Sequence, residues 1–237
     1  MDELLRLDKI LSLAGVSRAN ARKIIASGRV SVSGAVQRDS GFKARIADVC
    51  LDGAAVGAEA EVYLMLNKPA GVVTATEDRK LPTVVDLLPE KYANRKIGPV
   101  GRLDRDVTGL VLLTTDGEMA HRLISPRHKA EKRYRAVCEG RLTEADAAAF
   151  ASGIELSDFT ALPAKLKILS SSEAESAADV ILTEGKFHQV KRMFSAIGHP
   201  LKSLKRLQIG GVALDPALAE GEFRPLTAEE IQNLKSY

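Results

Sequence analysis

The sequence predicts an α+β protein that consists of a small N-terminal domain and a larger domain built on a mostly antiparallel mixed sheet with flanking helices. Most predicted strands follow one another through short turns, with few helices between them, which is not the pattern of a doubly wound fold. Residues 53–58 are small and lack a strong pattern, which is typical of a domain boundary. We therefore place a small domain at residues 1–56, a linker at 57–61 and the larger domain at 62–237.

The first 50 residues have the pattern of two short helices followed by a hairpin. Apolar residues recur every three or four positions from Leu7 to Ala14, which predicts a first helix. Ser17 is a favourable N-cap for a second helix, which ends before Gly28. Alternating valines and serines then lead into a turn at 33–34.

The larger domain alternates strands with a few capped helices. Ser125-Pro126 ends one helix, and Thr143 and Thr227 each open a helix in a capping box. A serine-rich stretch at 170–176 is interpreted as an exposed hairpin connection. Strands are predicted at 61–66, 110–114, 132–138, 162–169, 178–183 and 204–212, and helices at 119–124, 143–153, 190–197 and after 227.

Residues 98–110 form the least regular stretch of the larger domain. Three glycines, a proline and two aspartates precede a short apolar strand, which places Asp104 in a loop just before it. Loops held by a rigid scaffold commonly carry reactive groups, so Asp104 is a candidate catalytic residue. The residues alone leave a second interpretation equally open, in which Asp104 and Asp106 only bond nearby backbone N–H groups.

Composition and charge narrow the class of protein. The longest stretches without charged residues are too short to cross a bilayer, and charged residues interrupt the N-terminal leucines, so we expect a cytoplasmic protein without a membrane partner. Cys50 and Cys138 lie far apart and are predicted to be reduced. The net charge is only +3, yet residues 122–135 hold six Lys or Arg against one acid, and residues 185–206 hold six against none. Such clustering indicates a polyanionic partner, with a solvated basic face as the alternative.

Motifs of bound cofactors or metals are missing from the sequence. There is no GxGxxG, P-loop, HExxH or paired CxxC, and the four histidines lack metal-ligand spacing, so we expect neither metal nor cofactor. The remaining possibility is a reaction that a carboxylate side chain carries out on a polyanionic substrate. An ionised carboxylate needs a cation nearby, for which Lys191 is a candidate, and Tyr134 is a candidate to stack on a nucleobase. An ordinary strand position is the alternative for Tyr134, and spacing alone does not pair these residues with Asp104.

The N-terminal segment resembles an S4 domain, an RNA-binding module that grips structured RNA backbone. The resemblance rests on residues 6–11, 15–22 and 28–34, with Ser33 where that family usually has asparagine. Through Asp48 the segment carries nine Lys or Arg against five acids. The resemblance implies that RNA is bound by the cations of this domain: Arg6, Lys9, Arg18, Arg22, Lys23 and Arg29.

The larger domain resembles the pseudouridine synthases. Gly101-Arg-Leu-Asp-Arg-Asp-Val-Thr-Gly-Leu110 is similar to the catalytic-aspartate motif of that family. Further segments extend the resemblance to the RsuA branch, which acts on small-subunit ribosomal RNA: 66–71, 125–134, 184–193 and 209–211. Together with the S4 resemblance, these segments cover almost the full chain.

The resemblance implies roles for individual residues and a reaction. Asp104 is implied to be catalytic, Tyr134 to lie on the target base, Lys191 to pair with the aspartate in place of the arginine of other branches, and Arg102 to hold the flipped nucleotide or its phosphate. Asp106 is given a structural role. The implied reaction isomerises a uridine of small-subunit (16S) ribosomal RNA to pseudouridine, and a monomer is expected. The alternatives are a large-subunit (23S) target, or an RNA-binding ribosome assembly factor without catalysis.

Overall fold

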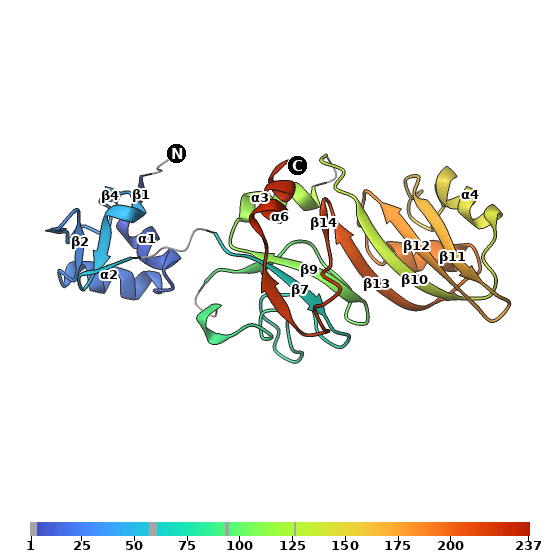
Figure 1. Cartoon of the computed structure of the whole chain (residues 1–237), viewed down its shortest axis with the longest axis horizontal. Coiled ribbons are helices and arrows are strands. Elements are labelled where there is room, and N and C mark those ends of the chain that lie inside the picture. Colours follow the sequence, from blue (N-terminus) through green and yellow to red (C-terminus); the bar gives the residue numbers. More distant parts are fainter. Residues whose placement is uncertain (1–3, 57–60, 93–94, 126) are drawn as a thin grey trace. The chain divides into compact units, whose positions relative to one another are not determined.

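The chain consists of two compact units (Figure 1). The computed structural model describes residues 4–56, 61–92, 95–125 and 127–237. One unit is Met1–Val62 with Leu88–Ile97, and the other is Tyr63–Leu87 with Gly98–Tyr237. Most of the predicted linker, residues 57–60, lies outside the described residues. Within the described part of the chain, no helix is long and apolar enough to span a membrane.

The first unit is a pair of helices beside short strands. Their apolar faces meet in a core that includes Leu7, Leu11, Ile25 and Val49, each 0% exposed. The unit contains α1 (Leu7–Leu13), α2 (Arg18–Ala26), the pair β1 (Leu5–Arg6) and β4 (Lys43–Ala44), the 3-10 turns η1 (Ile46–Asp48) and η2 (Glu90–Tyr92), and a sheet in the order β3 (Ala35–Val36), β2 (Val30–Val32), β5 (Val49–Leu51) and β6 (Ala54–Ala55).

The predicted helix boundaries of this unit are confirmed. The Ser17 hydroxyl accepts a hydrogen bond from the backbone N–H of Asn20, as an N-cap does. Gly28 follows α2 with φ +79°, the left-handed conformation that lets the chain turn away from a helix. Ser33 and Gly34 both have positive φ, and they connect β2 to β3 in the expected hairpin.

The second unit is a mixed sheet with helices, which confirms the predicted α+β class. Every strand pair recorded in it is antiparallel except β9 with β13. The spatial order is β11 (Lys165–Ser171), β12 (Glu175–Leu182), β10 (Lys132–Glu139), β13 (Leu201–Ile209), β9 (Thr108–Thr114), β7 (Tyr63–Lys68) and β15 (Phe223–Pro225), with β14 (Val212–Ala213) beside β13 and β8 (Gly98–Pro99) beside β9.

Helices cover this sheet in two places, as Figure 1 shows. One group contains α3 (Gly117–Ile124) and α6 (Ala228–Lys235), which lie together near β14, and α4 (Glu144–Ser152) lies along β11. The core under α3 and α6 includes Met65, Leu112, Leu123 and Leu234. The fourth helix, α5 (Gln189–Ala196), follows β12 and contributes Phe194, whose ring meets Phe150 of α4 edge to face.

Several predicted strand ends differ from the observed ones, and two stretches expected to be irregular are partly strand. The strand expected at 204–212 begins at Leu201 and stops at Ile209, because Gly210, with φ +54°, turns the chain into β14. The serine-rich stretch at 170–176 is mostly strand, with the connection reduced to residues 172–174, because the pairing of β11 with β12 continues to Ser171 opposite Ser176. Gly98 and Pro99 pair with β9 in spite of the proline, whose missing N–H is tolerated at such an edge.

Adjacent strands align three residues of the larger unit. Tyr134 on β10 lies opposite Arg206 on β13, and Arg206 in turn lies opposite Gly109 on β9. At Gly109 the two parallel strands approach so closely that a Cβ atom there would lie 2.3 Å from the carbonyl oxygen of Arg206. The β9–β13 pairing therefore depends on a residue without a side chain, and it joins residues 101–107 to the segment that follows α5.

We expect Gly109→Ala to lower the free energy of unfolding of the larger unit by more than about 2 kcal/mol, because alanine adds both a steric clash and strain at φ +99°. Urea unfolding followed by circular dichroism measures this. Gly117→Ala is the matched control, since a Cβ there meets no atom within 4 Å, and we expect it to stay within about 1 kcal/mol of the parent. If Gly109→Ala and Gly117→Ala were equally stable, that result would contradict the close approach of β9 and β13 at Gly109.

Candidate active site

The loop that carries Asp104 is fixed by hydrogen bonds on both sides. The Thr74 hydroxyl donates to the carbonyl of Leu103 at 2.8 Å and accepts from its N–H at 3.1 Å. The backbone N–H of Gly71 donates to the carbonyl of Arg105 at 2.8 Å. Because its backbone is held on either side of Asp104, the carboxylate has a defined position, as the loop prediction required.

Two buried cations add to this support. The Lys68 side chain is 0% exposed, and its Nζ donates to the carbonyls of Pro69 and Val72 at 2.8 Å and of Arg105 at 3.2 Å. The guanidinium of Arg206 donates to the carbonyl of Leu110 at 2.8 Å and of Arg102 at 3.4 Å. Carbonyl dipoles thus solvate both charges, and the loop backbone is held in return.

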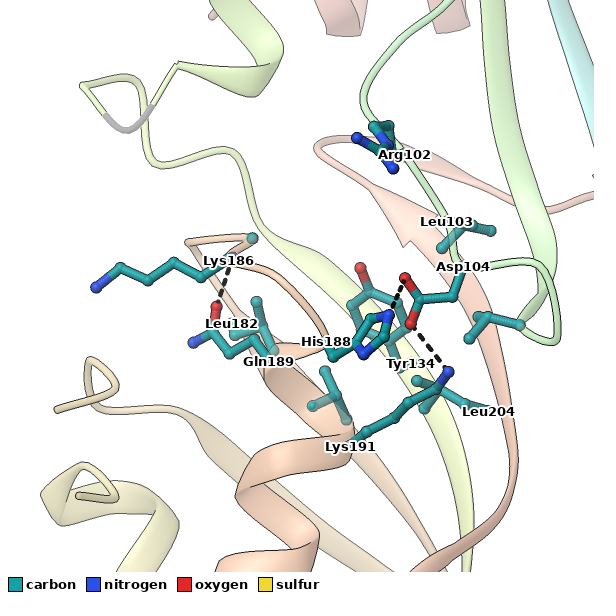
Figure 2. A pocket seen from close by; sticks show the side chains of 13 residues that line it. Arg102, Leu103, Asp104, Tyr134, Leu182, Lys186, His188, Gln189, Lys191 and Leu204 are labelled. Atoms are coloured by element: carbon teal, nitrogen blue, oxygen red, sulfur yellow. Dashed lines mark hydrogen bonds and ion pairs between the residues drawn. The ribbon is translucent and has the colours of Figure 1, made fainter. Parts of the chain in front are cut away.

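Lys191, on α5, contacts two carboxylates of this loop, those of Asp104 and Asp106. Figure 2 shows the contact with Asp104. The Nζ of Lys191 lies 2.9 Å from Oδ2 of Asp104 and 2.7 Å from Oδ1 of Asp106. The pairing of Lys191 with Asp104, which spacing could not establish, is therefore present. Asp106, predicted to be structural, shares the same ammonium, so its contact with Lys191 fits a supporting position.

Burial and charged neighbours shift the pKa values of Lys191, Asp106 and Lys68. Burial opposes the charge of Lys191, but hydrogen bonds to Asp106 and Asp104 hold its pKa above the ordinary value. The hydrogen bond from Lys191 is the main cause that lowers the pKa of Asp106. Burial lowers the pKa of Lys68 to about 8, against the opposing influence of Asp106 and Asp104.

His188 is a site residue that the sequence interpretation missed. Its Nε2 lies 3.5 Å from Oδ1 of Asp104, on the side opposite Lys191 (Figure 2). The backbone of His188 has φ +48°, a left-handed conformation that is uncommon outside glycine and often occurs at functional sites. Its ring stacks on Phe187, which is 72% exposed. The segment 184–193 pointed to this region, but only the left-handed turn before α5 brings the ring to Asp104.

A pocket around the Asp104 carboxylate brings together the four predicted site residues of the larger domain. Asp104, Tyr134, Lys191 and Arg102 all line it. Tyr134 is 8% exposed and forms one wall of the pocket. In Figure 2 the Arg102 side chain lies on the same loop but away from the carboxylate of Asp104. A carboxylate, a cation and an aromatic surface therefore surround one small space.

The six predicted RNA-binding cations of the first unit are exposed. Two of them are neutralised by neighbours, since Arg6 bonds Asp8 and Arg29 bonds Asp52. Arg22 lies 3.8 Å from Asp8, and Lys9, Arg18 and Lys23 complete the exposed set on or near the two helices. The structure thus places these cations on the surface, and their role toward RNA stays a prediction.

Comparison with known proteins identifies both units. Residues 62–196 match the model of the RNA pseudouridylate synthase family, and residues 5–50 match the S4 domain. The class of protein is therefore an RNA-modifying enzyme with an S4 domain ahead of its catalytic domain. The chain belongs to the RNA pseudouridylate synthase family, and it is an RNA pseudouridine synthase, an isomerase.

Relatives match along nearly the whole chain. The ribosomal small subunit pseudouridine synthase A of Escherichia coli is 43% identical over 97% of this chain and 100% of its own length. The uncharacterized RNA pseudouridine synthase YtzG of Bacillus subtilis is 39% identical over 97% of this chain and 98% of its own. A crystal structure of a pseudouridylate synthase, 38% identical, aligns with a TM-score of 0.69 over 97% of this chain and 99% of that one.

We expect Lys191→Met to raise the pKa of Asp106 toward the ordinary value of an aspartate, because the Lys191 hydrogen bond is the largest cause that lowers it. Carbon NMR titration of the Asp106 carboxyl group measures the shift. Lys186→Met is the matched control, since the Lys186 ammonium lies over the Phe159 ring, and it should leave the pKa of Asp106 unchanged. If the pKa of Asp106 stayed unchanged in Lys191→Met, that result would contradict the contact between the Lys191 ammonium and Asp106.

Proposed function

We propose that this protein converts a uridine of small-subunit ribosomal RNA to pseudouridine, with Asp104 as the catalytic residue. The observation that carries the proposal is the contact of 2.9 Å between the Lys191 ammonium and the Asp104 carboxylate in a pocket walled by Tyr134. The small-subunit substrate is supported by relatives that match along almost their whole length, among them the ribosomal small subunit pseudouridine synthase A of Vibrio parahaemolyticus, which is 44% identical.

The reaction redistributes bonds within one nucleotide. The N1–C1′ glycosidic bond breaks, the uracil turns over while it is enclosed, and C5 bonds to C1′. The C5 proton then leaves and N1 gains a proton, so no external group is consumed and no cofactor is needed. Each step requires a reactive carboxylate close to the ribose and the base, and Asp104 is the carboxylate at this position.

The remaining pocket residues position that carboxylate and the base. The Lys191 ammonium holds the Asp104 carboxylate in place through an ion pair of 2.9 Å. Tyr134 offers its buried ring as a surface for the extruded uracil, since a base removed from its stack is held by aromatic side chains. Arg102, exposed on the same loop, holds the flipped nucleotide or its phosphate.

The S4 domain anchors the substrate while the larger domain performs the chemistry. Its exposed cations supply contacts to RNA phosphates that do not depend on sequence. The protein acts on ribosomal RNA in the cytoplasm, as a monomer. An alternative, modification of large-subunit RNA by the same site, leads to a different position of the modified uridine and is distinguished by the first experiment below.

In a strain that lacks this gene, we expect one pseudouridine of small-subunit ribosomal RNA to disappear. The parent gene should restore it, and the Asp104→Asn variant should not, because an amide cannot supply the charged carboxylate. Pseudouridine mapping of total ribosomal RNA measures both. Purified parent protein should release tritium from RNA labelled at uridine C5, and Asp104→Asn should release it at least about 1000-fold more slowly.

Each contrary outcome overturns a different part of the proposal. Loss of a large-subunit pseudouridine instead would overturn the substrate. Unchanged pseudouridines together with no tritium release by the parent would favour an assembly factor without catalysis. Release by Asp104→Asn at the parent rate would overturn Asp104 as the catalyst. Asp106→Asn is the matched carboxylate control, and it should keep measurable activity because Asp106 only supports Lys191.

For the S4 domain, we expect Arg18→Ala combined with Arg22→Ala to weaken RNA binding and to make it less dependent on salt. Each lost phosphate contact reduces the number of counterions released on binding. The magnitude of the slope of log K against log salt concentration should therefore decrease by roughly 0.7 to 0.9 per contact. Fluorescence anisotropy at several salt concentrations measures the slope. The control replaces the exposed Lys165 and Lys167 of β11 by alanine. Equal slopes for both double variants would exclude these two arginines from the interface.

A further inference from the structure

A second cavity adjoins the Asp104 pocket at Tyr134. It has a volume of about 100 Å³, several times the space that one water molecule needs. It shares Arg102, Tyr134 and Gly185 with the Asp104 pocket, so the two spaces are neighbours. Its other polar lining residues are Lys132 and Arg206, and none of the described residues that line it is acidic.

Arg206 brings an unneutralised charge to this cavity. The residue is 3% exposed, its Nε and Nη1 bond only backbone carbonyls, and its Nη2 has no hydrogen-bond partner among the described residues. No carboxylate of the described chain forms an ion pair with it. A buried guanidinium without an anion is costly, since carbonyl dipoles offset only part of the charge that burial removes from water.

Lys132 increases the positive potential in the same space. It lies two residues before Tyr134 on β10, and the described structure records no ion pair for it. Burial and the nearby charge of Arg206 both lower its pKa, and both residues line this acid-free cavity. Repulsion of this kind is relieved when an anion enters, because each cation then gains a partner.

We propose that this cavity binds one phosphodiester group of the RNA substrate, next to the nucleotide that enters the Asp104 pocket, with Lys132 and Arg206 as its cations. The inference rests on the proposed RNA substrate and extends it to a defined phosphate. A purely structural Arg206 accounts for its two bonds to carbonyls, but it does not account for the unpartnered Nη2 or for a second cation on an acid-free cavity. A phosphate has enough oxygen acceptors for both cations.

The test neutralises one phosphate of the RNA at a time. A ribosomal RNA fragment that releases tritium with the parent protein is prepared as a series in which single linkages are methylphosphonates. Binding of the full chain is measured by anisotropy. With the parent, neutralising one linkage beside the target uridine should weaken binding about tenfold. Lys132→Gln should bind the unmodified fragment about tenfold more weakly and should lose no further affinity when that linkage is neutral.

Controls separate this site from general electrostatics. Lys167→Gln, on the exposed face of β11 and outside the cavity, should keep the parent response at every linkage. Equal sensitivity of Lys132→Gln and the parent at every linkage would overturn the proposal. So would Lys132-dependent binding of inorganic phosphate without any sensitive linkage, which would make the cavity a site for free anions. Thermal melting checks that Lys132→Gln is folded.

The result does not depend on which ribosomal RNA is modified. The fragment comes from whichever RNA releases the label, so a large-subunit target would overturn the substrate proposed above and leave this measurement intact. Conversely, a confirmed small-subunit target with a Lys132→Gln variant that responds like the parent would overturn only the phosphate site.

Discussion

The close approach of β9 and β13 at Gly109 is the constraint on which the site depends. Only a residue without a side chain lets the two parallel strands meet there, and their meeting places Arg206 beside the loop that carries Asp104. From that position the Arg206 guanidinium donates to the carbonyls of Arg102 and Leu110, which lie on either side of Asp104 in the chain. The same strand lies against β10, so Tyr134 follows in register. One backbone contact thus aligns the loop, its support and the aromatic wall.

The Asp104 site uses one cation for two carboxylates. Two aspartates two residues apart repel one another when both are ionised, and a single ammonium between them offsets that repulsion. Lys191 occupies that place, with Nζ within 3.0 Å of both carboxylates. Asp106 therefore matters to the site although it lies at the rim, because it limits where the ammonium can go. His188 faces the other oxygen of Asp104, which leaves the carboxylate enclosed between two nitrogen groups.

The secondary-structure elements and the types of residue in the site could be predicted from the sequence, but the contacts between those residues could not. Helix caps such as Ser17, and the loop position of Asp104, depend on neighbours in the chain and were predicted correctly. The pairing of Lys191 with Asp104 spans 87 positions and came only from the family resemblance. Neither His188 nor the buried Arg206 was recognised, because a left-handed turn and a parallel strand pair bring them to the loop. The predicted end of the strand at 204–212 was wrong, because Gly210, a turn residue, was counted as part of the strand.

The distribution of charge suggests why the site is built for an anionic substrate rather than for maximal stability. Lys68, Lys132 and Arg206 are all at least partly buried near one loop, and burial lowers the pKa of both lysines. Lys68 is solvated by carbonyls from three residues, which offsets its desolvation within the chain itself. Lys132 and Arg206 have no such complete set of partners. Their repulsion is a cost in the free protein, and the RNA phosphate proposed to bind there would relieve it in the folded state alone. By linkage, RNA bound in this way would stabilise the fold and the loop that carries Asp104 together.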